Sequence, residues 1–405
     1  MQYLIRFANV HETFRKPEIE ALAALANVDV EFVFYNKDSI FCTVKLKDEG
    51  SARALISRSI LAKGIYELWG SGKTYEEIHA DVQKRTSHQW SKYNTTSFKF
   101  LVDAFQGKRS PAEQNSLIQS FSYLGFKGPI RMNHPDQEFC IFEEWKIGGE
   151  SPQQLHLGRW VGGGDRNAIN KLSLKKRKYI STTSMDSELA LITANLTLAA
   201  PDTLFFDPFV GTGSFPIACS YFGAVTLGSD IDGRSVRGKN GRDIITNFKQ
   251  YGLMDRYLGS FISDLTNTPL RENALFDGIV CDPPYGVREG LKVLGRVGKL
   301  EEAIIINGKP AYMQDDYIPP KRAYSFEAML DDILHSASVM LVENGRLSVW
   351  MPTANDEDVE LLIPSHPGLE IGLGVSSPTE SYQEDKSHVT GRERKRRRKE
   401  FMQMN

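Results

Sequence analysis

The run Asp282-Pro283-Pro284-Tyr285 is the part of this sequence best suited to chemistry. It directly follows Phe276–Val280, an apolar segment typical of a buried strand. Consecutive prolines lack N–H donors and stiffen the turn, so the Pro283 carbonyl is left to point out of the strand end. That carbonyl and the Asp282 carboxylate can accept both N–H groups of an amine on an aromatic base, while Tyr285 offers a ring for stacking. The run therefore predicts a site for an exocyclic amino group, in preference to a purely structural turn.

A glycine-containing loop lies upstream, in Asp207-Pro208-Phe209-Val210-Gly211-Thr212-Gly213-Ser214. It follows the strand-like segment Thr203–Phe206. Glycines let the backbone approach a ligand, and the helix that begins after them favours a carboxylate at its N-terminus. A dinucleotide-binding G-x-G-x-x-G pattern would need glycine where Pro216 stands, which argues against that class. The remaining alternatives are a methionine carboxylate site and a glycine turn without a ligand.

Two further acidic residues end predicted strands. Asp230 follows Val225–Ser229, at the place where an acid reaches ribose hydroxyls in nucleotide-binding βαβ units. Asp264 ends Leu258–Ser263 in the same way and is placed to accept a hydrogen bond from an adenine amino group. An ordinary helix-capping aspartate is the alternative for Asp230.

Basic residues gather in two stretches. Lys171–Lys178 lies between the halves of the chain and includes Lys175, Lys176 and Arg177, which we regard as candidates for contact with an RNA backbone. A solvated connector is an equally good interpretation of that stretch. The run Arg392–Lys399 is typical of a disordered tail, and a nuclear address or nucleic-acid contact is the less favoured interpretation.

The elements that would hold these residues follow two patterns. Short apolar runs surround helical segments in the first part, which predicts two small α+β units. Their predicted elements are Tyr3–Phe7, Pro17–Ala26, Glu31–Tyr35, Ile40–Leu46, Phe98–Ala104, Pro111–Tyr123 and Phe139–Trp145. Gly158–Gly164 is rich in glycine and predicts a turn or linker after them.

From Thr203 the sequence alternates strand, glycine turn and helix, which is the pattern of βαβ units around a parallel sheet. Besides the segments already named, it includes predicted helices at Ser214–Phe222 and Arg234–Tyr251. A long charged insertion, Arg288–Pro320, interrupts the alternation. A helix at Ser325–Val342 and a strand at Arg346–Met351 then resume it. The second part is therefore predicted to be α/β.

Composition limits the function classes. The chain has 405 residues, of which 41% are hydrophobic and 25% charged, as expected for a globular protein of more than one domain. Its 49 Lys and Arg nearly balance 51 Asp and Glu, so RNA binding must depend on local patches. The four cysteines form no C-x-x-C pair and predict neither disulfides nor a metal site. Neither a signal peptide nor a membrane span is expected, which favours a cytoplasmic protein, with a nuclear one possible because of the basic tail.

Taken together, these motifs resemble a known family. Asp282-Pro283-Pro284-Tyr285 resembles the signature shared by methyltransferases acting on adenine N6, guanine N2 and glutamine side-chain nitrogen. Over residues 1 to about 355 the chain is similar to the catalytic subunits of eukaryotic tRNA guanosine-10 N2-methyltransferases. The segments that carry this wider resemblance are Gly158-Arg159-Trp160, Lys175-Lys176-Arg177, Thr183-Ser184-Met185-Asp186, Asp207–Gly213 and Asp282–Gly286.

The resemblance implies a fold and a set of ligands. It implies an α/β protein in which ferredoxin-like and THUMP α+β units, which hold tRNA, precede a Rossmann-like class I methyltransferase domain. It also implies S-adenosyl-L-methionine as cofactor and a small zinc-binding activator protein as partner, paired along an exposed sheet edge. The residues expected to hold the cofactor are Asp207, Phe209, Gly211, Gly213, Asp230 and Asp264, with the Met185 region closing over it.

One departure from the family lies at the C-terminus. Relatives end in a further strand pair, whereas here Leu369–Val375 leads into a polar segment and the basic tail. We therefore expect one or two closing strands to be absent. The activator would then cover the third strand of the methyltransferase sheet, Arg256–Ser263, which is an edge with little charge.

The sequence thus predicts four regions. Residues 1–160 bind tRNA, 161–185 form a basic linker, 186–375 form the methyltransferase domain and 376–405 form a disordered tail. The predicted activity is N2-methylation of a guanosine in tRNA, by direct displacement and without a metal. Two alternatives stay open at this point: an adenine N6 methyltransferase of nucleic acid, and a catalytically silent tRNA-binding subunit.

Overall fold

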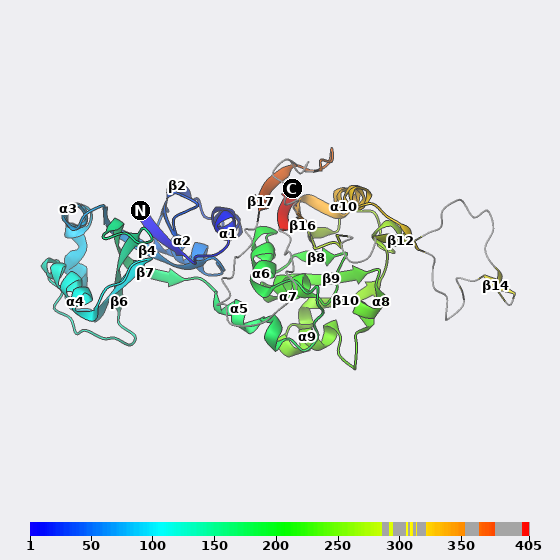
Figure 1. The fold of residues 1–405 in the computed structure, drawn as a ribbon, viewed down its shortest axis with the longest axis horizontal. Helices are drawn as coiled ribbons and strands as arrows, with labels where there is room; N and C mark the ends of the chain where they lie inside the picture. The colour runs from blue at the N-terminus through cyan, green and yellow to red at the C-terminus, as the bar shows by residue number, and fades with distance from the viewer. Residues whose placement is uncertain are drawn as a thin grey trace. The chain divides into compact units, whose positions relative to one another are not determined.

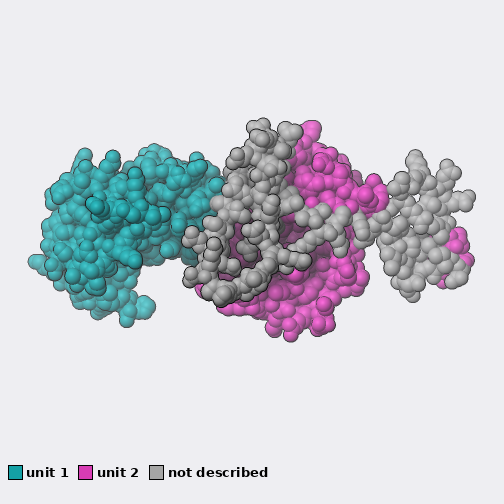
Figure 2. Space-filling model, in the orientation of Figure 1, with its two compact units in different colours: residues 1–166 teal, residues 167–405 magenta. Residues whose placement is uncertain are grey.

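The computed structural model describes residues 1–285, 291–294, 305–306, 308–310, 313, 321–352, 364–376 and 399–404. The chain divides into two compact units, Met1–Arg166 and Asn167–Asn405, which are coloured separately in Figure 2. Gly286 and most of the insertion Arg288–Pro320 lie outside the described residues, as does most of the basic run Arg392–Lys399.

The first unit is built on one seven-stranded sheet with the order β2-β3-β1-β4-β7-β6-β5. Figure 1 labels β2, β4, β6 and β7 of this sheet. Its strands are β1 (Gln2–Phe7), β2 (Glu31–Tyr35), β3 (Phe41–Lys45), β4 (Ala62–Gly72), β5 (Phe98–Phe105), β6 (Gln137–Trp145) and β7 (Pro152–Gly163). Its helices are α1 (Arg15–Ala26), α2 (Glu49–Ile56), α3 (Tyr75–Thr86) and α4 (Pro111–Ser120). The two α+β units expected from the sequence share this sheet, because the long strands β4 and β7 pair with each other.

The glycines of Gly158–Gly164 do not form a linker, and that prediction was wrong. Gly158, Gly162 and Gly163 belong to β7, which pairs with β4 on one side and β6 on the other. A Cβ atom on Gly158 would lie 2.7 Å from the Cβ atom of Tyr66 in the neighbouring strand. This glycine therefore permits close packing across the sheet, a role that glycine content alone does not distinguish from a turn.

The second unit contains another seven-stranded sheet, ordered β10-β9-β8-β11-β16-β18-β17. Its strands are β8 (Leu204–Asp207), β9 (Val225–Asp230), β10 (Tyr257–Ile262), β11 (Phe276–Cys281), β16 (Leu341–Pro352), β17 (Ile371–Ser376) and β18 (Lys399–Met404). The first five strands in this order are parallel, and β18 pairs antiparallel with both β16 and β17. The predicted α/β architecture is confirmed, as is the position of β10 at an edge.

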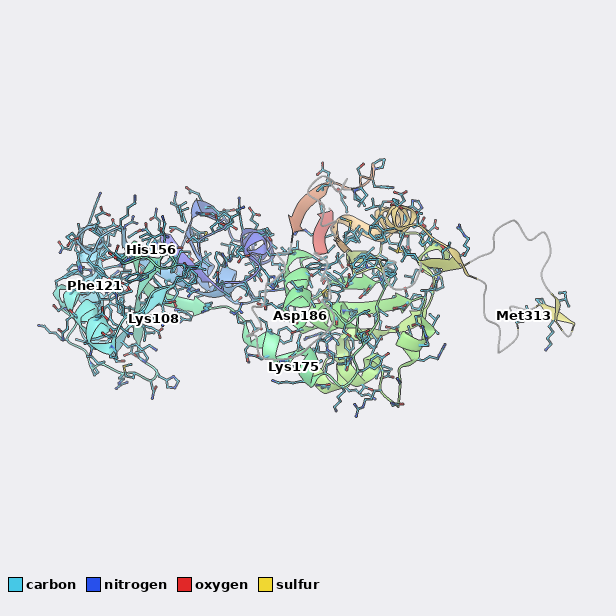
Figure 3. All side chains as sticks on the ribbon, in the orientation of Figure 1. Lys108, Phe121, His156, Lys175, Asp186 and Met313 are labelled. Carbon is cyan, nitrogen blue, oxygen red and sulfur yellow. The ribbon has the colours of Figure 1, made fainter. Side chains whose placement is uncertain are left out.

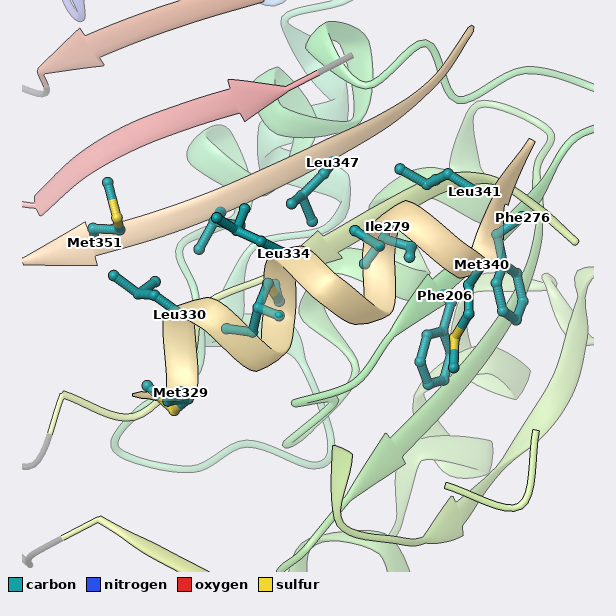
Figure 4. Packing of buried hydrophobic residues seen from close by; sticks show 14 residues of the cluster. Phe206, Phe276, Ile279, Met329, Leu330, Leu334, Met340, Leu341, Leu347 and Met351 are labelled. Carbon is teal, nitrogen blue, oxygen red and sulfur yellow. The ribbon is translucent and has the colours of Figure 1, made fainter. Parts of the chain in front are cut away.

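Helices cover this second sheet. They are α5 (Asn167–Lys171), α6 (Ser187–Leu196), α7 (Ser214–Tyr221), α8 (Gly233–Arg237), α9 (Ile244–Tyr251) and α10 (Phe326–Met340). On α10, Leu330, Ile333, Leu334 and Ala337 recur at helical spacing and are all buried. Figure 4 shows residues of this stripe packed against Phe206, Ile279 and Leu347 of the sheet. Burial of each large side chain contributes roughly 1.5–3 kcal/mol, so α10 fixes one face of the sheet firmly.

The single helix predicted at Arg234–Tyr251 is wrong, because the chain forms two short helices there. Gly238, Asn240 and Gly241 between α8 and α9 have φ angles of 79°, 53° and 69°. A right-handed helix cannot contain such angles. Asp243 then caps α9 by accepting a hydrogen bond from Thr246 N at 2.8 Å.

The expected absence of closing strands is also wrong. Residues Lys399–Met404 form β18, which lies between Leu347–Pro352 of β16 and Ile371–Ser376 of β17. The apolar pattern in this strand is short and follows the basic run, so the sequence alone favoured a tail. Within the described residues, no helix is both long and apolar enough to cross a bilayer.

Shorter elements complete the described chain. They are η1 (Glu12–Phe14), η2 (Ser87–Tyr93), η3 (Ser122–Leu124), η4 (Leu174–Lys176), η5 (Met254–Arg256), η6 (Leu265–Asn267), β12 (Lys292–Leu294), β13 (Ile305–Ile306), β14 (Lys309–Pro310) and β15 (Lys321–Ala323). Strand β12 in the insertion pairs with β15, which directly follows the insertion, and β13 pairs with β14 within it. Both pairs are antiparallel and lie outside the main sheet.

The position of β18 generates a testable prediction. Met402 stands opposite Val349 of β16 and Gly374 of β17. The substitution Met402→Pro removes a backbone donor from an inner strand, so we expect the second unit to lose about 1–3 kcal/mol of stability. Urea unfolding, together with faster hydrogen exchange in β16, measures this loss. Met402→Ala keeps the backbone donor and is the control, and equal unfolding of the two variants would contradict the placement of β18.

Candidate active site

Four aspartates lie at the same edge of the second sheet. Asp207 ends β8, Asp230 ends β9, Asp264 follows β10 and Asp282 follows β11. These strands are parallel, so their carboxyl ends meet at one edge, which is where open α/β sheets bind ligands. The structure therefore brings together the acidic residues that the sequence singled out separately.

The glycine loop between β8 and α7 has the conformation that its glycines allow. Gly211 and Gly213 have φ angles of 50° and 83°, and Gly213 is the N-cap of α7. A Cβ atom on Gly213 would lie 2.9 Å from Ile244 of α9. Glycine is therefore required at this position for both conformation and space. At the start of the loop, Phe209 N donates a hydrogen bond to Asp207 Oδ1 at 2.9 Å.

Asp230 connects the glycine loop to the end of β9. Its Oδ2 atom accepts a hydrogen bond from Gly211 N at 2.9 Å, and its Oδ1 atom accepts one from Asp232 N at 2.8 Å. This carboxylate therefore orders the loop, and a carboxylate oxygen has further lone pairs with which it can accept a ribose hydroxyl. Asp232 itself is paired with Arg234 and caps α8.

Asp207 is buried, with an exposed fraction of 2%. Burial raises the pKa of its carboxyl group well above the ordinary value, and the nearby charges of Asp230 and Asp282 raise it further. The hydrogen bond from Phe209 N acts in the opposite direction. The three carboxylates are therefore electrostatically coupled at the sheet edge.

Asp264 is also buried and starts the short turn η6. Its Oδ1 atom accepts hydrogen bonds from Thr266 N at 2.9 Å and from Thr266 Oγ1 at 3.0 Å. Asp264 therefore caps this turn, which fixes its side chain beside the edge of the sheet. Its assignment to an adenine amino group stays a prediction.

The run after β11 places a carboxylate and a phenol in contact. The Tyr285 hydroxyl donates to Asp282 Oδ1 and also lies 3.2 Å from Trp350 O in β16. Burial and the Asp282 charge raise the pKa of Tyr285 well above its ordinary value, so this hydroxyl remains a donor. The rings of Tyr285 and Phe326 are in an edge-to-face arrangement, with 6.2 Å between their centroids. Pro283 is buried.

The segment before α6 packs onto the glycine loop. Ser184 Oγ lies 2.7 Å from Thr212 Oγ1, and Ser214 Oγ donates to Met185 O at 3.1 Å. Met185 is 7% exposed. Ser184 and Ser214 stand in segments already singled out in the sequence, but they received no role there because the residues they contact lie far away along the chain. Asn247 was missed for the same reason.

Asn247 is fully buried in α9 and holds the same segment. Its amide donates to Tyr179 O at 2.7 Å and to Thr212 O at 3.3 Å. Its Oδ1 atom accepts from Tyr179 N at 2.9 Å. One side chain therefore joins the segment before α6 to the glycine loop.

These residues fit a nucleoside cofactor with a carboxylate at its other end. The glycine loop and the N-terminus of α7 suit the carboxylate, and acids at the ends of β9 and β10 suit the ribose and base. The carboxylates of Asp207, Asp230 and Asp264 in this region already accept hydrogen bonds from backbone N–H groups. The donor set is consistent with S-adenosyl-L-methionine.

The basic stretch before the sheet divides into exposed and buried residues. Lys175 and Lys176 are exposed, and Lys175 is labelled in Figure 3. Arg177 is only 6% exposed and donates to Ser214 Oγ at 2.8 Å and to Leu172 O at 3.1 Å. This position does not suit a contact with an RNA phosphate, so the expectation for Arg177 has to be revised.

Two known domain families match the chain. Residues 1–166 match the family described as the Tmrp11 THUMP N-terminal domain, and residues 175–305 match the RMKL-like methyltransferase domain. The two matches follow the division into compact units, because the first ends at Arg166.

Sequence relatives cover most of the chain. The tRNA (guanine(10)-N(2))-methyltransferase of Saccharomyces cerevisiae is 42% identical over an alignment that covers 91% of this chain and 88% of that protein. The human tRNA (guanine(10)-N(2))-methyltransferase TRMT11 is 33% identical, with coverage of 91% and 83%. Among solved structures, TrmN from Thermus thermophilus has 14% identity, coverage of 100% and 99% and a TM-score of 0.46, which is too low to add to the sequence relationship.

The burial of Asp207 generates a prediction about pH. Its folded-state pKa is raised above that of an unfolded chain, so its contribution to stability is present below the unfolded pKa and is lost as pH rises through the folded pKa. In the variant Asp207→Asn, the side-chain oxygen can still accept the hydrogen bond from Phe209 N, but the side chain no longer titrates. The loss of stability with rising pH is therefore absent from this variant. We expect the variant to gain stability relative to the native chain between pH 5 and pH 8 (roughly the range above an ordinary aspartate). Thermal unfolding at both pH values measures it, and a constant difference between the chains would contradict the raised pKa.

Proposed function

The chain belongs to the tRNA (guanine(10)-N(2))-methyltransferase family, and from this premise we propose that Asp282, Pro283 and Tyr285 present the N2 amine of guanosine 10 in tRNA for methylation. The observation that supports the proposal most directly is the contact of Tyr285 with Asp282 at the end of β11. The names of the relatives favour guanine N2 over the adenine N6 alternative and favour an enzyme over a silent subunit.

The exocyclic amine of guanine is a weak nucleophile, because its lone pair is delocalised into the ring. In the proposed mechanism the Asp282 carboxylate and the Pro283 carbonyl accept its two N–H groups, which localises the lone pair on nitrogen. S-adenosyl-L-methionine supplies the methyl group when it is bound. The nitrogen must give up one proton after it is methylated, and we assign the acceptance of this proton to the Asp282 carboxylate.

Tyr285 has two parts in this proposal. Its hydroxyl donates to Asp282 and so fixes the direction in which the carboxylate presents its remaining lone pairs. Its ring offers an apolar face to a base that has left its stack. Phe326 in α10 contacts the ring edge and keeps it from turning away.

The cofactor residues are assigned to separate parts of S-adenosyl-L-methionine. Gly211 and Gly213 let the backbone approach the methionine part, with Asp207 and Phe209 holding the start of the loop. Asp230 binds the ribose and Asp264 the adenine amino group, while Met185 covers the site from the segment before α6. The contacts of Ser184 and Ser214 with this loop region support that last assignment.

The tRNA substrate is assigned to the first unit, with Lys175 and Lys176 as further contacts from the second. The first unit contains a hollow of about 520 Å³ whose lining includes Arg53, Lys99 and Trp160. Arg53 and Lys99 are paired with Glu49 and Glu138, so this hollow is not a strongly positive site. A base or sugar edge, which needs both donors and acceptors, suits it better than an isolated phosphate.

The activator is assigned to strand β10. This strand is an edge of the sheet and exposes Leu258 and Ile262 by 64% and 48%. Met254 and Ile245, which are 38% and 41% exposed, add apolar surface on neighbouring elements. An exposed edge with apolar side chains is suited to pairing with a strand of another protein. We therefore propose that the zinc-binding activator pairs along β10.

The proposed chemistry predicts the behaviour of Asp282→Ala. We expect kcat for methyl transfer to unmodified tRNA, measured with the activator present, to fall by about 10²-fold or more. The KM values for tRNA and cofactor should change little, since the carboxylate acts on the amine and anchors neither ligand. Mapping of the labelled base in the native reaction should identify N2 of guanosine 10.

The matched control is Asp331→Ala, which removes an exposed carboxylate from α10 in the same unit. It should methylate tRNA at the native rate. Near-native turnover by Asp282→Ala would refute the role of Asp282, whereas a label on another base would refute the substrate assignment.

The partner proposal predicts the effect of charge on β10. Replacing both Leu258 and Ile262 with lysine should abolish co-purification of the activator, because desolvated charges would lie in the new strand pair. Phe261 packs against the core and is left unchanged. Leu275→Lys alters another exposed leucine, one that precedes β11 in the middle of the sheet, and should leave the complex intact. A complex that survives the double change would place the activator elsewhere.

A further inference from the structure

Arg177 is a buried cation for which the proposed mechanism has no use. It comes from the basic stretch that the sequence assigned to RNA, but it is 6% exposed, whereas Lys175 and Lys176 beside it are exposed. Its Nη1 atom donates to Ser214 Oγ and its Nη2 atom to Leu172 O, while its Nε atom has no hydrogen-bond partner. Among the described residues, no carboxylate forms an ion pair with it.

A guanidinium in the interior without a directly paired anion is unfavourable. Burial lowers the pKa of Arg177, whereas Tyr251 and the charge of Asp186 act in the opposite direction. Its guanidinium carbon lies 6.0 Å from the centre of the Tyr251 ring, so it gains some cation–π attraction. Buried charges usually have a counter-ion or coordinate a ligand. Asp186 favours the charge of Arg177, but within the described residues no carboxylate lies at ion-pair distance from it.

The Arg177 side chain is directed at the N-terminus of α7. Ser214, which accepts its hydrogen bond, is the first residue of that helix and follows the glycine loop. The same hydroxyl donates to Met185 O. The Ser214 side chain thus links the guanidinium to the N-terminus of α7, which attracts anions, and to the segment containing Met185, which packs on the glycine loop.

We propose that Arg177 is a positioning residue for the carboxylate of the cofactor's methionine part, acting through Ser214 and adding a fixed positive charge at the N-terminus of α7. The inference rests on the proposed cofactor site and assigns it a residue that the sequence had given to RNA. The bound cofactor then brings a carboxylate towards a charge that has no direct ion-pair partner within the described residues. The glycine loop alone would bind the same carboxylate more weakly.

The test uses two ligands that differ only in the carboxylate: S-adenosylhomocysteine and decarboxylated S-adenosylhomocysteine. Affinities are measured by calorimetry on the full chain, without tRNA. Arg177→Gln keeps a hydrogen-bond donor for Ser214 but removes the charge. We expect it to weaken S-adenosylhomocysteine binding by about tenfold and the decarboxylated ligand by less than about twofold. Arg177→Lys keeps the charge and should retain most of the preference for the carboxylate.

Two controls separate this role from a structural one. Lys249→Gln removes an exposed positive charge from α9 and should leave both affinities unchanged. Ser214→Ala keeps the Arg177 charge but removes the hydroxyl between it and the helix end, so a carboxylate-selective loss there supports the proposal even if Arg177→Gln does not fold. Thermal unfolding of each variant identifies those that fold.

An equal loss of both ligands in Arg177→Gln and in Ser214→Ala would overturn the inference and leave Arg177 as a packing residue. Unchanged affinity for S-adenosylhomocysteine in both variants would overturn it as well. If the native chain bound neither ligand, the proposed cofactor site itself would fail, which is a different result.

Discussion

The carboxylate of Asp230 holds the centre of the site together. It accepts hydrogen bonds from Gly211 N in the glycine loop and from Asp232 N at the end of β9. The loop, whose glycines adopt positive φ angles, is also held by backbone hydrogen bonds from Val210 N to Ser229 O and from Gly213 N to Val210 O, and the Asp230 contact completes the set that fixes its path. Because α7 begins at the end of the loop, the direction of that helix and of the segment packed on it depends on the same interaction.

Burial of charge gives the site its chemical character. Asp207 lies in the interior with a raised pKa, and Asp282 accepts a hydrogen bond from a tyrosine that is itself largely removed from water. Electrostatic interactions are stronger in such surroundings, so each group has a large effect on its neighbours. Arg177, which donates to Ser214 at the start of α7, is a buried basic residue. Acids at the strand ends and a cation at the helix end match the two ends of a nucleoside that carries an amino acid.

The frame that supports these groups extends well beyond them. The stripe of α10 packs on the sheet beside β11, and Trp350 in β16 supplies the carbonyl near Tyr285. Trp350 is fully buried and its indole donates to Thr193 Oγ1 in α6 at 3.1 Å. Strand β18 then pairs along β16 and protects an edge that would otherwise be open. The orientation of Asp282 and Tyr285 thus depends on elements that follow them in the chain.

The sequence alone predicted the parallel sheet, the glycine loop and the aspartates at the strand ends, because strand period, glycine and proline act on the residues next to them. It failed for Gly158–Gly164, whose glycines serve close packing between strands, and for Lys399–Met404, whose pairing partners lie in β16 and β17. The sequence analysis also grouped Arg177 with Lys175 and Lys176 as a candidate for contact with RNA. Only the tertiary structure decided that this side chain enters the interior and that the Tyr285 hydroxyl meets Asp282. Burial and side-chain partners arise from contacts between elements, and no local pattern in the sequence encodes them.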